Sequence, residues 1–310
     1  MNDTGFAFVL NNLNIDDLDL PFVLDEKSTL RRATPAEVSH FEELLKSGGI
    51  FARGIVPHGS VIKKASGNSG PGRYVPPEKT ALLIIETKNF NHHVSLLNLA
   101  GKLADYDLTL AGYTSYSDEK DRTKFGMSSL FNHAELVLLD SFTRNEPVHV
   151  SRAELEQLAL YYKIIESKAK DAWLGRALTI FGDINSLPVF SELRTLSYFS
   201  VLECLLTKKA SGGSMSIDKQ LQNKTELLFN FSSYKTDPAS YFGGINLKKL
   251  WRVLYELRSN IAHGNVYSFT GDLSCLKDLQ NVNQFLSGLA RQILRTAVNQ
   301  YQLVADLREC

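Results

Sequence analysis

The sequence has few cysteines, no net charge and no long apolar run, and each absence excludes a class of protein. The cysteines Cys204, Cys275 and Cys310 are scattered without the spacing of metal ligands, which suits a reducing cytoplasm. No stretch approaches ~20 uninterrupted apolar residues, so no membrane span is expected. Residues 1–12 lack the basic lead and the apolar core of a signal peptide, so we expect a cytoplasmic protein.

The overall charge gives no sign of a nucleic-acid partner, because 34 basic side chains balance 34 acidic ones. The charges are nevertheless unevenly distributed. Residues 1–150 contain 15 basic and 19 acidic side chains, whereas residues 151–310 contain 19 basic and 15 acidic ones. The second half is therefore mildly basic, which is compatible with an RNA substrate.

Familiar catalytic motifs are missing from the first half. The segment 63–77 is rich in glycine and serine but lacks the spacing of a P-loop, so a surface loop is predicted there. The run TALLIIE leads to Glu86 and Lys88, half of a PD-(D/E)xK nuclease signature, but no convincing Pro-Asp pair lies upstream. His92 and His93 are neighbours on an expected helix, where their side chains diverge by about 100° and make a poor metal pair. We therefore predict no metal and no cofactor.

The first half is predicted to be an α+β domain, residues 1–147. A capping box, Thr34-Pro35-Ala36-Glu37, predicts a helix through about Lys46. The apolar run at 80–86 does not alternate, which is typical of a central strand. The other expected elements are short strands at 6–10, at 18–24 and near 30, further strands at 50–62 and 135–140, and a helix at 94–104.

The second half, residues 148–310, is predicted to be a helical bundle. A second capping box, Ser151-Arg152-Ala153-Glu154, follows a boundary expected near Pro147. Beyond it, apolar residues recur at helical spacing in one segment after another. The expected helices are 151–171, 173–181, 189–208, 217–231, 248–265 and 274–307.

One of these segments, residues 248–265, carries groups suited to chemistry at its end. Its sequence is KKLWRVLYELRSNIAHGN, with an apolar stripe on one helical face and a terminating Gly264. Arg258 and His263 lie near the end, and Ser259 and Asn260 lie between them. Arginine binds a phosphate through two hydrogen bonds, and histidine transfers protons near neutral pH. Together they provide what the cleavage of an RNA phosphodiester needs without a metal.

The spacing of these two residues poses a geometric problem. Five residues along a regular helix separate two side chains by about 140°, so Arg258 and His263 would not face one phosphate. Either the helix unwinds near Gly264 and turns the imidazole, or two copies of the helix meet and line one cleft. The simpler interpretation is a helix end that uses both residues as favourable charges against the helix dipole.

The stretch LRSNIAHG resembles the R-x4-6-H motif of HEPN domains, and in particular the Apea-like HEPN families of prokaryotic defence proteins. The earlier run LSYFSVLECLL is similar to a helix of those domains in which a glutamate, here Glu203, follows an aromatic-rich run. The resemblance covers roughly residues 150–310. HEPN motifs often have Asn, Asp or His directly after the arginine, whereas this chain has Ser259 there and Asn260 one residue later.

The resemblance implies an all-helical bundle that dimerises through the motif helices and has metal-independent endoribonuclease activity. His263 would transfer the proton, and Arg258 would bind the scissile phosphate, with Glu203 holding its guanidinium. Ser259 or Asn260 would orient the histidine or the phosphate. Single-stranded RNA is the expected substrate, with a 2′,3′-cyclic phosphate as the product. The candidate base-stacking groups, for which core packing is the alternative, are Tyr255, Tyr267 and Phe269.

The sequence leaves other functions open. The helical half could be a catalytically inactive dimerisation or RNA-binding module in which the motif forms the interface. The α+β half could be a sensor for a phage component or a nucleotide that regulates the helical half. An active nuclease of this type would serve anti-phage defence or toxin-mediated growth arrest.

Overall fold

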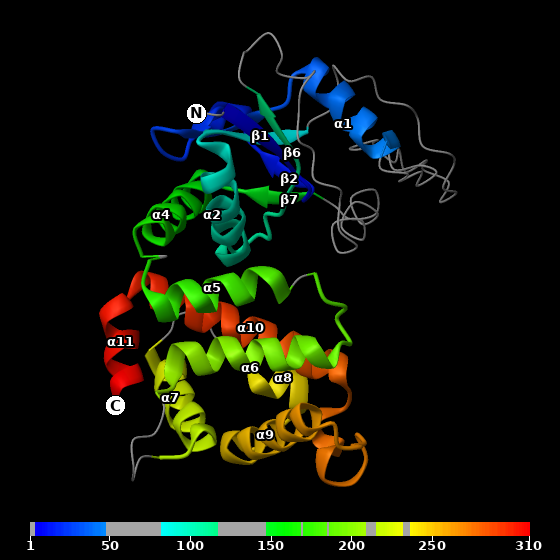
Figure 1. Ribbon diagram of the computed structural model, residues 1–310, viewed down its shortest axis with the longest axis vertical. Helices are drawn as coiled ribbons and strands as arrows, with labels where there is room; N and C mark the ends of the chain where they lie inside the picture. The colour runs from blue at the N-terminus through cyan, green and yellow to red at the C-terminus, as the bar shows by residue number, and fades with distance from the viewer. Residues whose placement is uncertain are drawn as a thin grey trace. The chain divides into compact units, whose positions relative to one another are not determined.

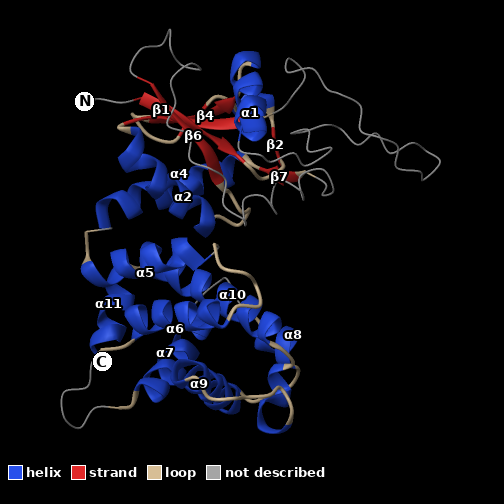
Figure 2. Cartoon of the chain, turned by 45° about the vertical axis from the view of Figure 1, so that its right-hand side comes forward, coloured by secondary structure: helices blue, strands red, loops and turns tan. Residues whose placement is uncertain are grey.

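The computed structural model describes residues 4–47, 82–116, 147–168, 170–184, 186–208, 215–231 and 236–310 (Figure 1). The chain divides into two compact units, Met1–Lys163 and Ile164–Cys310. The strands expected at 50–62 and 135–140 and the loop expected at 63–77 lie outside the described residues. The first unit contains the strands and the second is helical, as Figure 2 shows by colour.

The first unit contains a five-stranded antiparallel sheet with strand order β3-β4-β5-β1-β6. A smaller parallel pair joins β2 to β7. The strand predicted at 80–86 is β5, and it lies at the centre of the sheet as its apolar run indicated. The bounds are β1 Thr4–Val9, β2 Leu13–Ile15, β3 Phe22–Val23, β4 Ser28–Arg32, β5 Leu83–Lys88, β6 Leu110–Tyr116 and β7 Val148–Val150.

Helices cover both faces of this sheet. Successive side chains of β1 point to opposite sides, so β1 contacts a helix on each face. Phe6 and Phe8 are fully buried in a cluster that includes Val38 and Phe41 of α1. On the other face, Gly5 lies so close to α2 that an added Cβ would be 2.5 Å from the ring of Phe90. The first-unit helices are α1 Pro35–Ser47, α2 Phe90–Leu103 and α4 Arg152–Lys168, with a 3-10 turn η1 at Asp17–Asp19.

Both predicted capping boxes are present. The Thr34 backbone N–H donates to Glu37 Oε2 at 2.8 Å, and the Glu37 N–H donates to Thr34 Oγ1 at 3.3 Å. At the start of α4, the backbone N–H and the hydroxyl of Ser151 both donate to Glu154 Oε2 at 2.7 Å. These two hydrogen bonds hold the pKa of Glu154 below its usual value, and the bond from the Ser151 hydroxyl has the larger effect. Local sequence therefore fixed both helix starts.

Replacing Ser151 with alanine is expected to lower the free energy of unfolding by about 1 kcal/mol at pH 7, because the first turn of α4 loses its cap. Folding lowers the pKa of Glu154, so the stabilisation that the Ser151–Glu154 hydrogen bonds provide is fully present above the pKa of Glu154 in the unfolded chain. It disappears as the pH falls through the pKa of Glu154 in the folded chain. Urea unfolding at pH 7 and at pH 3 measures it. Ser167→Ala, which removes an exposed hydroxyl from the same helix, is the control. A Ser151→Ala deficit that does not shrink in acid would contradict the assignment.

The second unit is built around α6, Glu192–Leu206, which is buried on most of its circumference. It packs against α5, α7, α9, α10 and α11. A buried polar link supports the packing with α10, because Thr195 Oγ1 donates to Asn283 Oδ1 at 2.7 Å. The other helices are α5 Ala172–Ile184, α7 Ile217–Phe231, α8 Pro238–Phe242, α9 Leu247–His263, α10 Leu279–Asn299 and α11 Tyr301–Glu309, with a 3-10 turn η4 at Gly271–Leu276.

The structure departs from the sequence-based expectations at particular places. The division between units falls inside α4 and not near Pro147, because β7 pairs with β2 and Tyr162 of α4 contacts His93 of α2. The helix expected at 274–307 is interrupted by the positive φ of Lys277 and again at Gln300. Strand β6 was not predicted at all.

None of the helices in the described part of the chain combines the length and the apolar composition that a membrane span needs.

Candidate functional site

Helix α9 carries the motif residues at its C-terminal end. Asn246 caps the start of the helix by accepting a hydrogen bond from the Lys248 N–H at 2.9 Å. The apolar stripe is buried as its spacing predicted, with Leu250, Leu254 and Leu257 fully enclosed. Gly264 ends the helix in the left-handed conformation, with φ 68° and ψ 23°.

Arg258 is held by the glutamate that sequence reasoning paired with it. Its Nη2 donates to Glu203 Oε1 at 3.2 Å, and the side chains of Arg258 and Glu203 are 29% and 22% exposed. The guanidinium carbon lies 5.6 Å from the ring centre of Tyr255. Its Nε is buried and has no hydrogen-bond partner within the described parts of the chain. The guanidinium is thus oriented by Glu203 through Nη2, and the Arg258 side chain remains partly exposed.

His263 is the last residue of the helix, and its side chain is exposed. It makes no hydrogen bond or ion pair with any residue that the structure describes. The helix is continuous through His263, so the unwinding that could have turned the imidazole does not occur, and the divergence of about 140° from Arg258 remains. One chain alone therefore does not direct both side chains to one phosphate, and a shared site requires a second copy.

The two residues between them have different surroundings. The Asn260 side chain accepts a hydrogen bond from Asn265 Nδ2 at 3.3 Å, and its backbone oxygen accepts from the Asn265 N–H at 2.9 Å. Asn260 therefore supports the chain reversal after the helix. Ser259 is half-buried and precedes His263 by one helical turn, so its hydroxyl is on the side of the helix that carries the imidazole.

The three candidate stacking residues are occupied within the fold. Tyr255 makes an edge contact with Phe199 of α6, with ring centres 6.4 Å apart. Tyr267 donates a hydrogen bond to Glu192 at 2.7 Å, and its ring makes an edge contact with Phe269, with ring centres 5.7 Å apart. Burial and this carboxylate raise the pKa of the Tyr267 hydroxyl. Tyr267 and Phe269 are half-buried beyond the end of α9, in the segment that follows the motif.

Glu86, from the half-signature in the first half, serves the fold. Its Oε2 accepts a hydrogen bond from Arg31 Nε at 2.9 Å, and its Oε1 accepts one from the Tyr116 hydroxyl at 2.5 Å. Arg31 belongs to β4 and Tyr116 to β6, and both strands are part of the same sheet as Glu86. The carboxylate is therefore engaged in cross-strand packing.

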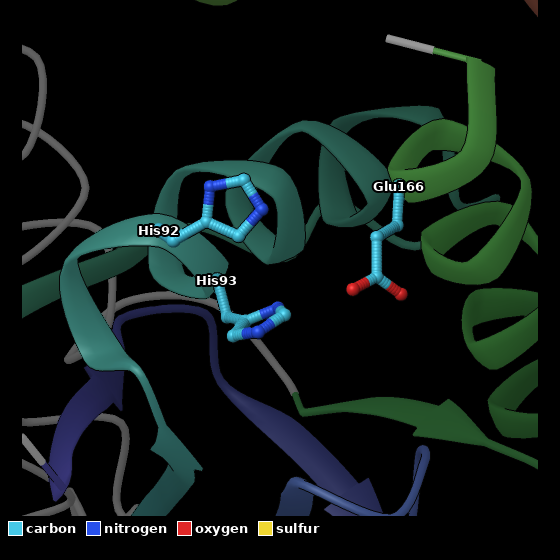
Figure 3. A group of neighbouring side chains, drawn as sticks. All are labelled: His92, His93 and Glu166. Atoms are coloured by element: carbon cyan, nitrogen blue, oxygen red, sulfur yellow. The ribbon is translucent and has the colours of Figure 1, made fainter. Parts of the chain in front are cut away.

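His92, His93 and Glu166 form a group that sequence spacing did not predict (Figure 3). Each offers one potential ligand atom, and these atoms lie within 4.8 Å of one another. The imidazole centres of the two histidines are 4.9 Å apart, and His93 Nδ1 is 2.5 Å from the Tyr162 hydroxyl. Imidazole and carboxylate are donors that Zn²⁺ accepts. Because Glu166 is distant in sequence, the spacing of the two histidines alone could not reveal the group.

Comparisons of this chain with protein-family models, curated proteins and solved structures find no match. The HEPN resemblance therefore stays a prediction from the motif and from the order of its helices.

Proposed function

We propose that this chain is a metal-independent endoribonuclease of the HEPN type that acts on single-stranded RNA. The observation that carries the proposal is the arrangement of α9. Its last turns carry a guanidinium oriented by Glu203 and an exposed imidazole at His263, and they contain no carboxylate. RNA brings its own nucleophile, so the protein must only transfer protons and stabilise the charge on phosphorus.

In the proposed reaction, His263 accepts the proton of the 2′-hydroxyl, whose oxygen attacks the adjacent phosphorus. Arg258 binds the non-bridging oxygens and stabilises the charge that grows on them in the transition state. The bond to the 5′-oxygen breaks, that oxygen takes a proton from solvent, and a 2′,3′-cyclic phosphate remains. His263 then releases to solvent the proton that it accepted. Glu203 positions Arg258, and Ser259 is placed to orient the imidazole. Because Arg258 and His263 diverge on one helix, each site combines Arg258 of one copy with His263 of another.

The proposal predicts that the purified protein cleaves a single-stranded RNA in the presence of EDTA. Mass spectrometry of the fragments should find 2′,3′-cyclic phosphate ends. The matched control is the same oligonucleotide with one 2′-deoxy sugar at the main cleavage position, which should not be cut there. Cleavage of the deoxy position, or cleavage that appears only when Mg²⁺ is added, would contradict the mechanism.

The second candidate function is an inactive RNA-binding module. Two observations favour it: Glu203 already neutralises Arg258, and within one chain His263 points away from it. Such a module would bind the same RNA without cutting it. RNA binding without any product in EDTA would support this function over the nuclease.

A further inference from the structure

A basic pocket lies at the other end of α9, between its first turns and α7, which are adjacent helices (Figure 1). Its volume is about 460 Å³. Four cationic side chains and one carboxylate are among the lining residues, namely Lys219, Lys248, Lys249, Arg252 and Asp218. None of the four cations forms an ion pair with any residue that the structure describes. Their charge is therefore available to an anion from outside the chain.

The placement of two of these lysines opposes the local electrostatics of the helix. The first turn of α9 contains no acidic residue, and Lys248 and Lys249 occupy its second and third positions. The N-terminus of a helix carries a partial positive charge, so acidic residues stabilise that turn and lysines destabilise it. An anion at this end would interact favourably with both the lysines and the backbone N–H groups. The two lysines thus depart from the preference for acidic residues in the first turn of a helix, and a binding site for an anion would explain the departure.

Trp251 provides an independent observation. It lines the same pocket, its side chain is only 2% exposed, and its indole Nε1 is buried without a hydrogen-bond partner in the described regions. A buried N–H without a partner costs free energy, and native proteins rarely leave one unsatisfied. Because this N–H is enclosed in the structure, a ligand oxygen would reach it only after the side chains around the pocket shift.

The pocket shares a face of α9 with the candidate catalytic histidine. Arg252 and His263 are both exposed, and eleven residues of helix place them about 20° apart in angle and roughly 16 Å apart along the axis. At roughly 3.4 Å per stacked nucleotide, that distance corresponds to about five nucleotides, and to fewer in a stretched strand. Glu256 lies between them on this face, and its carboxylate repels phosphate. The attraction of this face for the RNA backbone is therefore strongest at the pocket.

We infer that this pocket is a second phosphate-binding subsite, which holds a backbone phosphate of the RNA strand whose scissile bond lies at His263. The inference rests on the proposed function and deepens it. The lysines and Arg252 bind the phosphate, and Trp251 lies beside it in the lining of the pocket. The enzyme would then prefer strands that are long enough to reach from one end of α9 to the other.

The test compares Lys248→Ala/Arg252→Ala with a control of equal charge change, Lys88→Ala/Lys163→Ala, whose side chains are exposed in the other unit. Both pairs are combined with His263→Ala, so that binding is measured without cleavage. Fluorescence anisotropy with a 20-nucleotide single-stranded RNA should show about tenfold weaker binding for the pocket variant and a salt dependence that is shallower by about one unit. The control should match the parent. Equal losses in both variants, or no loss in the pocket variant, would overturn the subsite.

A second readout follows the pocket itself. In a Trp173→Phe background Trp251 is the remaining tryptophan, and its fluorescence should change when the 20-nucleotide RNA binds but not when a dinucleotide binds. If inorganic phosphate produces the same change without weakening RNA binding, the pocket is a site for free phosphate and the inference is wrong. Pocket-dependent RNA binding in a wild-type protein that never cleaves RNA would overturn the nuclease proposal alone. Absence of RNA binding would overturn both.

Discussion

Replacing His263 with alanine is expected to reduce the rate of RNA cleavage in EDTA by at least a hundredfold. Proton transfer by a positioned side chain contributes roughly 10²–10⁴-fold to a rate, and His263 is the imidazole at the motif. Because the side chain is exposed, its removal should change the free energy of unfolding by no more than about 0.5 kcal/mol. Single-turnover cleavage and urea unfolding measure the two effects separately. His149→Ala, which removes an exposed imidazole elsewhere, should leave the rate unchanged.

The shared site can be tested by mixing two inactive variants. If Arg258 of one copy and His263 of the other form each site, a dimer of one His263→Ala chain and one Arg258→Ala chain retains one intact site. Random pairing in a symmetric dimer would then restore about a quarter of the wild-type activity. Mixtures that stay inactive would exclude the shared site, and cleavage that survives in His263→Ala alone would exclude the histidine. Expression of wild type should arrest growth, and Arg258→Ala should relieve the arrest.

Replacing Arg31 with methionine is expected to destabilise the first unit by about 3–5 kcal/mol, because it breaks a buried ion pair and leaves the carboxylate behind. Two nitrogens of Arg31 donate to Glu37 at 2.8 and 3.0 Å, and Glu37 is completely buried. Burial alone would lower the pKa of the guanidinium, but Glu37 and then Glu86 raise it above its usual value, so it stays charged. Unfolding followed by circular dichroism measures the loss.

The matched control for Arg31 is its neighbour. The guanidinium of Arg32 pairs with Asp17, whose side chain is 80% exposed, and exposed ion pairs contribute only about 0–1 kcal/mol. Arg32→Met should therefore cost far less than Arg31→Met. Similar losses in the two variants would show that the aliphatic stems, and not the buried pair, stabilise this corner of the sheet.

Local sequence signals predict the structure correctly where neighbouring residues supply the interactions. The caps at Thr34 and Ser151 bond residues three positions away, and Gly264 adopts the left-handed turn that ends α9. The central strand β5 followed from an apolar run, since a strand buried on both faces need not alternate. Strand β6 was missed because its pairing with β1 is a long-range contact.

The sequence by itself determined the helix starts, the apolar stripe of α9 and the presence of Arg258 and His263 in its last turns. Only the tertiary structure decided that the helix stays regular through His263, that Glu203 bonds Arg258, and that lysines without an ion-pair partner among the described residues gather beside Trp251. The physical reason is range. Capping and periodicity act within a few residues, whereas the direction and the surroundings of a side chain depend on which helices pack beside it.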